Sequence, residues 1–142
     1  MKQVHLYSDG SSLGNPGAGG YCAVLKYGDA QKIVKGAELD TTNNRMELKA
    51  VIEGLKVLKQ PCRVTITSDS NYVVKAINEW LKNWIKKDFK GVKNPDLWRE
   101  FLEVSKPHQL EANWVKGHAG HEENELCDKI AREEATRIKN GK

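Results

Sequence analysis

The sequence predicts an α/β fold, and three observations lead to this prediction. Segments with the alternation of a β-strand and segments with apolar residues at helical spacing follow one another in the order β-β-β-α-β-α-α-β-α. The length of 142 residues suits one compact domain. No internal repeat, linker or low-complexity segment divides the chain. We therefore expect a single domain over residues 1–142.

The N-terminal part of the chain predicts three strands joined by short turns. Residues 4–8 alternate apolar and polar side chains, and this strand is expected to end at Asp9. Residues 21–27 form a second, apolar strand, and residues 31–37 form a weaker third one after the turn signal Gly28-Asp29. Because such short turns join antiparallel neighbours, the three strands are expected to form an antiparallel meander.

The glycine-rich run YSDGSSLGNPGAGG, residues 7–20, connects the first two of these strands. It lacks the G-x-x-x-x-G-K-[ST] pattern of a nucleotide-binding phosphate loop, and no helix follows it. Apolar strands flank it closely, which argues against a linker, and Asn15-Pro16-Gly17 is a turn signal. We expect a hairpin connection whose backbone amides can face a ligand beside Asp9.

The remainder of the chain predicts helices interrupted by two short strands. Apolar residues recur at helical spacing in four segments, residues 46–58, 72–84, 95–104 and 122–138, and the strands are residues 64–67 and 110–115. Capping residues precede the first helix, and Pro61 stops it. Pro95 suits the first turn of the third helix. Acids at the start of the last helix and Arg137 near its end suit the helix dipole.

Composition and charge exclude several classes of protein. No apolar run approaches the ~20 residues of a membrane span, and the N-terminus lacks a signal-peptide core, so we expect a cytoplasmic protein without membrane contact. Cys22, Cys62 and Cys127 lie far apart and form no C-x-x-C pair, which argues against a disulfide framework or a zinc site and predicts free core thiols. The net charge of +4 is mild, so its local distribution matters more.

Four acidic residues are candidates for chemistry: Asp9, Glu47, Asp69 and Asp128. Asp9 and Asp69 follow two strands, and strands that end side by side would bring them to one edge of a sheet. Glu47 and Asp128 lie next to core positions, where an acid is costly unless it is paired or binds metal. Local alternatives remain open, and they are an Asx turn at Asp9, a capping box of Glu47 with Asn44, a helix cap at Asp69 and a solvated position for Asp128.

Residues 80–99 combine basic and aromatic side chains. The basic residues are Lys82, Lys86, Lys87, Lys90, Lys93 and Arg99, and the acids among them are Asp88 and Asp96. The interleaved aromatic residues are Trp80, Trp84, Phe89 and Trp98. A local basic surface of this kind is typical of a protein that binds a polyanion. The alternative is a set of partly buried tryptophans beside a solvated basic face.

A series of strings, in this order, resembles bacterial ribonuclease H of type 1. They are DGS at residues 9–11, GNPG at 14–17, TTNNRMEL at 41–48, SDS at 68–70, WVKGHAGH at 114–121, NE at 124–125 and CD at 127–128. The resemblance covers residues 4–135, which is nearly the whole chain. It implies one ribonuclease H-like α/β domain. Its sheet would be mixed and five-stranded, in the order 3-2-1-4-5, with strand 2 antiparallel to its neighbours and about four to five flanking helices.

The resemblance implies an endonuclease that hydrolyses the RNA strand of RNA–DNA hybrids by two-metal-ion catalysis, leaving 5′-phosphate and 3′-hydroxyl ends. It assigns metal binding to Asp9, Glu47, Asp69 and Asp128, and it assigns His118 a part in proton handling or product release. Carboxylate oxygens suit Mg²⁺, so two Mg²⁺ ions are expected with substrate, and Mn²⁺ as a substitute. Because crowded acids repel one another, we expect weak metal occupancy in the free protein.

The resemblance also implies a set of contacts with the hybrid. Residues placed to read the 2′-hydroxyl groups of RNA are Gly10, Ser12, Asn15, Asn43, Glu47 and Asn71. Thr42 and Asn94 would hold a phosphate of the DNA strand. The basic segment resembles a handle for the DNA strand, and its expected contacts are Trp80, Trp84, Lys86, Lys87, Phe89 and Lys90, with Asn124 completing the set. This segment is shorter than in better-known relatives, which predicts a lower affinity.

Other functions fit the sequence less well. The main alternative is a non-catalytic hybrid-binding module of the same fold, and the intact set of four acids argues against it. DNA-cutting nucleases of related fold differ in carboxylate spacing and lack the TTNNRMEL string. A reverse transcriptase domain is disfavoured because the chain starts just before its first strand and stops after its last helix. We therefore expect a free-standing, monomeric enzyme.

Overall fold

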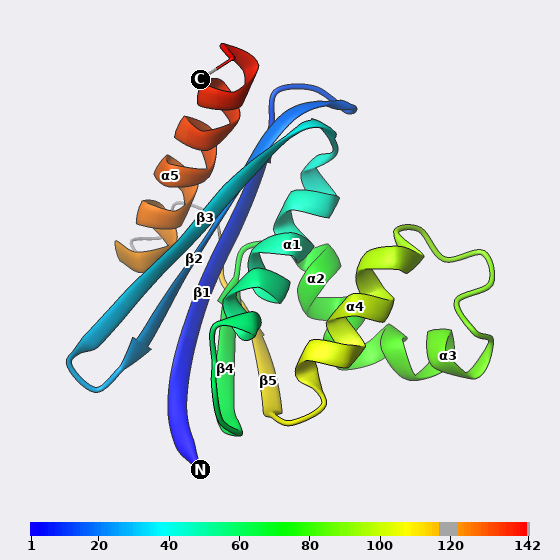
Figure 1. Cartoon of the computed structure of the whole chain (residues 1–142). Helices are drawn as coiled ribbons and strands as arrows, with labels where there is room; N and C mark the ends of the chain where they lie inside the picture. Colours follow the sequence, from blue (N-terminus) through cyan, green and yellow to red (C-terminus); the bar gives the residue numbers. More distant parts are fainter. Residues whose placement is uncertain (117–121, 142) are drawn as a thin grey trace.

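The computed structural model describes residues 1–116 and 122–141 as one five-stranded sheet with helices packed against both faces (Figure 1). Helix α1 (Asn43–Lys56) covers one face and α5 (Glu122–Lys139) the other. Neighbouring residues of a strand point to opposite faces, and β2 (Gly17–Tyr27) is buried along most of its length. The described residues therefore have the layered architecture that the order of elements predicted.

The sheet has the order β3-β2-β1-β4-β5. Its other strands are β1 (Lys2–Ser12), β3 (Ala30–Thr41), β4 (Cys62–Ser68) and β5 (Gln109–Trp114). Strand β2 runs antiparallel to both β1 and β3, and β4 runs parallel to both β1 and β5. The predicted mixed sheet is therefore confirmed, including the direction of the second strand.

Strand β1 is longer than predicted, and this corrects the position of Asp9. The strand continues through Asp9 to Ser12, whose pairing partner in β2 is Gly19. Asp9 therefore lies inside the strand and not at its end. Only residues 13–16 remain as a hairpin loop, where the N–H of Leu13 donates to the carbonyl of Ala18 at 2.8 Å.

Two glycines, one in β1 and one in β2, allow helices to approach the sheet closely. A Cβ atom on Gly20 would lie 2.3 Å from the carbonyl oxygen of Ala131 in α5. A Cβ atom on Gly10 would lie 2.3 Å from the backbone nitrogen of Glu47 in α1. Glycine is required at both positions because any side chain would push the helix away. The second contact brings Glu47 next to β1.

The remaining helical segments are α2 (Asn71–Lys75), η1 (Ala76–Trp80), α3 (Leu81–Lys86) and α4 (Pro95–Ser105). The helix predicted at residues 72–84 thus contains a π-helical turn, η1, which a regular periodicity of 3.6 residues does not reveal. Within this turn Asn78 donates through Nδ2 to the carbonyl of Ala112 in β5 at 2.9 Å. Among the described residues, no helix is long and apolar enough to cross a bilayer.

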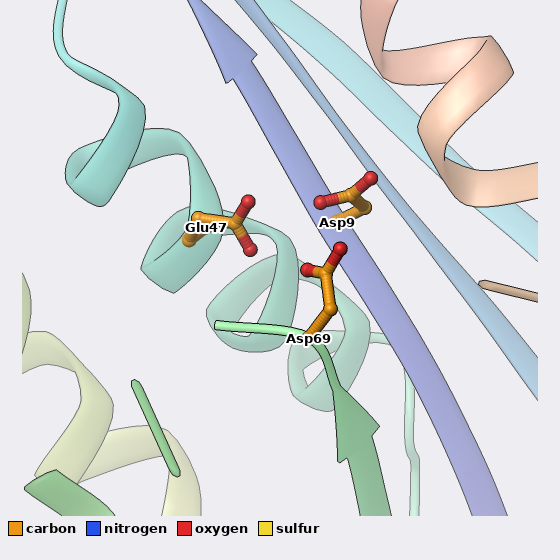
Figure 2. A group of neighbouring side chains, drawn as sticks. All are labelled: Asp9, Glu47 and Asp69. Atoms are coloured by element: carbon orange, nitrogen blue, oxygen red, sulfur yellow. The ribbon is translucent and has the colours of Figure 1, made fainter. Parts of the chain in front are cut away.

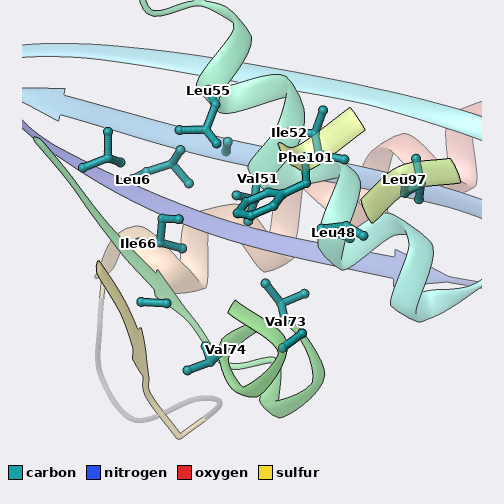
Figure 3. Packing of buried hydrophobic residues seen from close by; sticks show 14 of the residues in the cluster. Leu6, Leu48, Val51, Ile52, Leu55, Ile66, Val73, Val74, Leu97 and Phe101 are labelled. Atoms are coloured by element: carbon teal, nitrogen blue, oxygen red, sulfur yellow. The ribbon is translucent and has the colours of Figure 1, made fainter. Parts of the chain in front are cut away.

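The main hydrophobic core lies between the sheet and helices α1, α2 and α4. Figure 3 shows Leu6 and Ile66 from the sheet facing Val51 and Leu55 of α1, with Phe101 of α4 close by. A smaller cluster under α5 contains Cys22, Val24 and Cys127. All three cysteines are buried and free, which confirms the prediction of core thiols.

Candidate active site

Three acidic side chains from distant parts of the sequence converge at one place. Asp9 in β1, Glu47 in α1 and Asp69 just after β4 each offer a carboxylate oxygen, and these oxygens lie within 4.8 Å of one another. Figure 2 shows the three carboxyl groups pointing toward a common point between strand β1, the end of β4 and helix α1. Such a cluster of oxygen ligands is suited to a hard divalent cation.

The parallel pairing of β1 with β4 places Asp9 beside Asp69. The register pairs Ser8 with Ser68, and Asp9 and Asp69 are the residues that directly follow these two serines. Ser70, and not Asp69, caps helix α2, since its hydroxyl accepts from the N–H of Val73 at 3.2 Å. The carboxylate of Asp69 is therefore not used as the helix cap, and that alternative is wrong.

The N-cap of helix α1, the helix that carries Glu47, is not the predicted alternative of a capping box between Asn44 and Glu47. Thr42 is its N-cap, and the Thr42 hydroxyl accepts from the N–H of Arg45 at 3.2 Å. Asn44 already lies inside the helix, so the capping box with Glu47 is wrong. Asp9 accepts from the N–H of Gly10 at 2.9 Å, but both residues belong to β1, so no Asx turn forms.

The three-carboxylate site is buried and electrostatically crowded. Asp9 is 5% and Glu47 4% exposed, and Oε2 of Glu47 has no hydrogen-bond partner among the residues that the structure describes. Burial, reinforced by the charges of Asp69 and Asp128, raises the pKa of Asp9 to about 7. Burial and the neighbouring Asp9 raise the pKa of Glu47 well above its ordinary value. A bound cation would relieve both effects, so the residues fit a metal.

The fourth predicted carboxylate does not join the other three. Asp128 lies on α5, and its Oδ2 accepts from Nε of Arg132 at 3.1 Å and lies 3.0 Å from Nη2. Its charge nevertheless raises the pKa of Asp9, so the group acts on the site electrostatically. His118 falls within residues 117–121 and so lies outside the described residues.

A polar pocket of about 310 Å³ lies at the N-terminus of α1. Its lining residues are Asn15, Thr42, Asn43, Asn44, Lys93 and Asn94. The N–H of Asn43 donates to Oδ1 of Asn15 at 3.0 Å, which joins the hairpin loop to the helix start. The structure therefore brings together four of the predicted hybrid contacts, from three separate segments.

The other expected hybrid contacts outside the basic segment are Gly10, Ser12, Asn71 and Asn124, and the structure gives each a different setting. Gly10 is buried against α1, whereas Asn71 is exposed at the start of α2. Ser12 is half-buried at the end of β1. Asn124 donates through Nδ2 to the carbonyl of Thr67 at 3.2 Å, and its buried Oδ1 has no partner among the described residues.

Only some of the side chains of the basic segment are exposed on the surface. Lys86, Lys87 and Lys90 are exposed, as is Trp80, whose ring centroid lies 5.8 Å from that of the half-buried Trp84. Phe89 is only 7% exposed and belongs to the main core.

The predicted substrate contact of Phe89 is therefore contradicted. Asp88 and Phe89 both have positive φ, 52° and 60°, and this turn directs the Phe89 ring inward. The guanidinium of Arg99 lies 5.0 Å from the ring centroid. A left-handed turn at a bulky residue has no clear signal in the sequence, so the sequence pattern does not indicate that the Phe89 ring faces the core.

Two residues near the site had no predicted role. Trp114 is 48% exposed, and its Nε1 donates to the carbonyl oxygen of Asp69 at 3.0 Å. Arg45 contacts Asn94, which lines the polar pocket. Both belong to the strings WVKGHAGH and TTNNRMEL, and that is the only signal by which the sequence marked them.

Comparisons with known proteins bear on this site. The RNase H family model matches residues 1–136. Ribonuclease H of Sulfurovum sp. (strain NBC37-1) is 62% identical over 138 residues, which are 97% of this chain and 94% of that protein. The crystal structure of LC9-RNase H1, a type 1 RNase H with the type 2 active-site motif, has a TM-score of 0.89 and 31% identity, covering 96% of this chain and 73% of that one. LC11-RNase H1 in complex with an RNA/DNA hybrid has the same fold, with a TM-score of 0.69, 21% identity and coverage of 95% and 98%.

Proposed function

Because the chain belongs to the ribonuclease H family of metal-dependent endoribonucleases, we propose that it cleaves the RNA strand of RNA–DNA hybrids at the site of Asp9, Glu47 and Asp69. The observation that carries this proposal is the convergence of three carboxylates within 4.8 Å from β1, α1 and the end of β4. A hybrid-binding module without catalysis would not need this arrangement, because burying crowded acids costs stability.

We propose Mg²⁺ as the cofactor, with two ions in the presence of substrate and Mn²⁺ as a substitute. Asp9, Glu47 and Asp69 would hold it through their carboxylate oxygens, and Asp128 would join them by releasing Arg132. When bound, the metal supplies activation of water and neutralisation of the charge that develops on the phosphate oxygens. The donor set supports this choice, since Mg²⁺ prefers oxygen ligands.

The protein's own groups prepare the site for this chemistry. Burial keeps water away from Asp9 and Glu47, so their interaction with a cation is stronger than in bulk solvent. The Gly10 N–H holds one oxygen of Asp9 in place. We propose His118 as a proton carrier for the reaction or for product release, since an imidazole titrates near neutral pH. The expected products have 5′-phosphate and 3′-hydroxyl ends.

The polar pocket is proposed to bind a phosphate of the DNA strand. The Thr42 hydroxyl accepts from the helix backbone and retains its own hydrogen to donate. Lys93 adds a positive charge, and the pocket lies at the positive end of the α1 dipole. A solved protein of this fold carries an RNA/DNA hybrid, which supports a hybrid as the ligand class.

Recognition of RNA is proposed to occur beside the three-carboxylate site. Gly10, Ser12, Asn15, Asn43, Glu47 and Asn71 remain the candidates for contact with 2′-hydroxyl groups, with Asn124 nearby. The exposed residues of the basic segment, Trp80, Lys86, Lys87 and Lys90, together with half-buried Trp84, would follow the DNA strand. Phe89 is removed from this set because its ring is in the core.

We propose in addition that residues 1–142 act as one domain, as a monomer and in the cytoplasm. The described residues support a single domain, since all five strands belong to one hydrogen-bonded sheet. Sedimentation of the purified protein tests the monomer, and a mass near 16.0 kDa is expected.

Cleavage of three labelled duplexes tests the proposed function. RNA–DNA hybrid, double-stranded RNA and double-stranded DNA are each incubated with Mg²⁺ or with chelator, using the wild type and Asp9→Asn. We expect metal-dependent cutting of the RNA strand of the hybrid alone, and none by the variant. Comparable cutting of either homoduplex would refute the specificity. Hybrid binding without cutting would favour the non-catalytic module.

A further inference from the structure

Arg45 links two residues at the start of α4. Its Nη1 donates to Oδ1 of Asn94 at 3.2 Å and to Oδ1 of Asp96 at 3.0 Å. Its Nη2 donates to Oδ2 of Asp96 at 2.7 Å. The fork geometry of the guanidinium fits the carboxylate in a bidentate manner and leaves one further contact for Asn94. Asp96 thus holds the Arg45 guanidinium in contact with the side-chain amide of Asn94.

The other side of the Asn94 amide is also held. Its Nδ2 donates to the hydroxyl oxygen of Tyr72 at 3.1 Å, and Nε1 of the fully buried Trp98 donates to the same oxygen at 2.8 Å. An indole N–H and a guanidinium can only donate. The Tyr72 oxygen therefore accepts, and Arg45 donates to the amide oxygen of Asn94. Among the described residues, the Asn94 amide nitrogen uses one N–H for Tyr72, which leaves the other for a ligand.

Asn94 itself occupies an unusual position for its residue type. It is the N-cap of α4, and asparagine at this position usually accepts from the helix backbone through its side chain. Here it makes no such bond, and its backbone is left-handed, with φ of 58° and ψ of 43°. The side chain is committed to Arg45 and Tyr72 instead. The amide is thus held at the rim of the polar pocket, which Asn94 lines.

We propose that Arg45 is a positioning residue for the polar pocket, because it fixes the Asn94 amide with its N–H, and not its oxygen, available to a phosphate of the DNA strand. This inference rests on the proposed phosphate-binding role of the pocket. Without Arg45 the amide can turn over, since its two ends are nearly equal in size. Its oxygen would then face the phosphate and repel it, so a donor contact is replaced by an unfavourable one.

Arg45 acts by orientation and not by its net charge. Asp96 is paired with it, so the two charges largely offset each other beside the pocket. The variant Asp96→Asn separates the two possibilities, because it removes a negative charge near a phosphate and also loosens the fork that holds Arg45. A pure charge effect would strengthen hybrid binding in this variant. An orienting role weakens it.

The test compares KM and kcat for hybrid cleavage in Arg45→Met, Asp96→Asn, Asn94→Ala and the double variant Arg45→Met/Asn94→Ala. Lys106→Met serves as the control, because it breaks a pair with Glu103 of α4 in which both side chains are exposed. We expect KM to rise about three- to tenfold in each single variant, as for one lost hydrogen bond, with kcat at saturating hybrid retained. The salt dependence of KM should stay close to that of the wild type in Asn94→Ala, because an uncharged amide neutralises no phosphate.

The double variant decides whether Arg45 acts through Asn94. We expect it to lose no more than Asn94→Ala alone, because the amide that Arg45 orients is already gone. Additive losses, or tighter binding by Asp96→Asn, would overturn the proposal. If Asn94→Ala and Thr42→Ala both leave KM unchanged, the phosphate pocket itself is wrong, which is a different failure. Should Arg45→Met not fold, Asp96→Asn still gives a decisive sign.

Discussion

Asp9 and Asp69 lie one residue beyond Ser8 and Ser68, the last pair that the parallel register of β1 and β4 matches. The register places two acids from segments about sixty residues apart side by side, just beyond the last pair of β1 and β4. Because side chains alternate between the faces of a sheet, a shift by one residue would point them to opposite sides. The register of these two strands thus determines where two of the active-site acids lie.

Replacing Asp69 by asparagine should abolish cleavage and also stabilise the metal-free protein. The variant keeps the shape of the side chain but removes a charge that raises the pKa of both Asp9 and Glu47. We expect a loss of activity of at least about a hundredfold and a gain of roughly 1–2 kcal/mol in the free energy of unfolding. Cleavage assays and urea unfolding in chelator check these outcomes, and an unchanged or lower stability would contradict the repulsion.

The pH dependence of stability should carry the signature of the crowded acids. Asp9 has a pKa of about 7 in the folded protein against an ordinary value of 3.8, so the folded state keeps a proton that the unfolded chain has lost. Stability from this group is therefore present at low pH and lost as pH rises from about 4 to 7. The measurement is the difference in unfolding free energy between wild type and Asp9→Asn in chelator. A difference that is constant across this window would refute the shift.

Replacing Trp114 by phenylalanine should weaken metal binding while the protein stays folded. The change removes the donor to the Asp69 carbonyl but keeps an aromatic ring at this half-exposed position. We expect about a fivefold weaker affinity for Mg²⁺ in the substrate-free protein, as for the loss of one hydrogen bond. Calorimetric titration measures it. Trp80→Phe is the control, and equal titrations of all three proteins would show that Trp114 does not hold Asp69.

Replacing Gly10 by alanine should displace Glu47. The new Cβ would meet the Glu47 nitrogen at 2.3 Å and the Met46 carbonyl carbon at 2.4 Å, so α1 must move. We expect a lower kcat and a loss of about 1–3 kcal/mol in stability. Gly28→Ala is the control, because it strains a positive φ of 55° where nothing lies within 4 Å. It should lose stability and keep kcat, and a normal kcat in Gly10→Ala would be against the displacement.

Replacing Phe89 and replacing the neighbouring lysines should have opposite consequences. Phe89→Ala empties part of the core, so we expect a loss of about 2–4 kcal/mol in unfolding free energy and an unchanged KM for the folded protein. The triple variant of Lys86, Lys87 and Lys90 to alanine should keep its stability, raise KM and flatten its salt dependence. A raised KM with normal stability in Phe89→Ala would return that ring to the binding surface.

Local signals in the sequence were enough for the order of the elements, whereas the roles of the four acids came from the family resemblance. Apolar spacing located the helices because a helix repeats every few residues, and Pro95 marked the start of α4. Helix α1 ends at Lys56, before Pro61, so that prediction of its end was wrong. Where neighbouring residues allowed two interpretations of a helix cap, the sequence did not decide between them. Asn44 and Thr42 are both good caps, and only the packed helix shows that Thr42 is used.

The sequence by itself determined that four acids, a glycine-rich hairpin and a basic segment belong to one α/β chain. Only the tertiary structure decided that Asp9, Glu47 and Asp69 meet while Asp128 pairs with Arg132, that Phe89 turns into the core, and that Arg45 holds Asn94. The physical reason is the distance along the chain over which each kind of interaction acts. Propensity and periodicity act over a few neighbouring residues, whereas strand register, helix docking on glycines and side-chain networks depend on contacts between segments far apart in the chain.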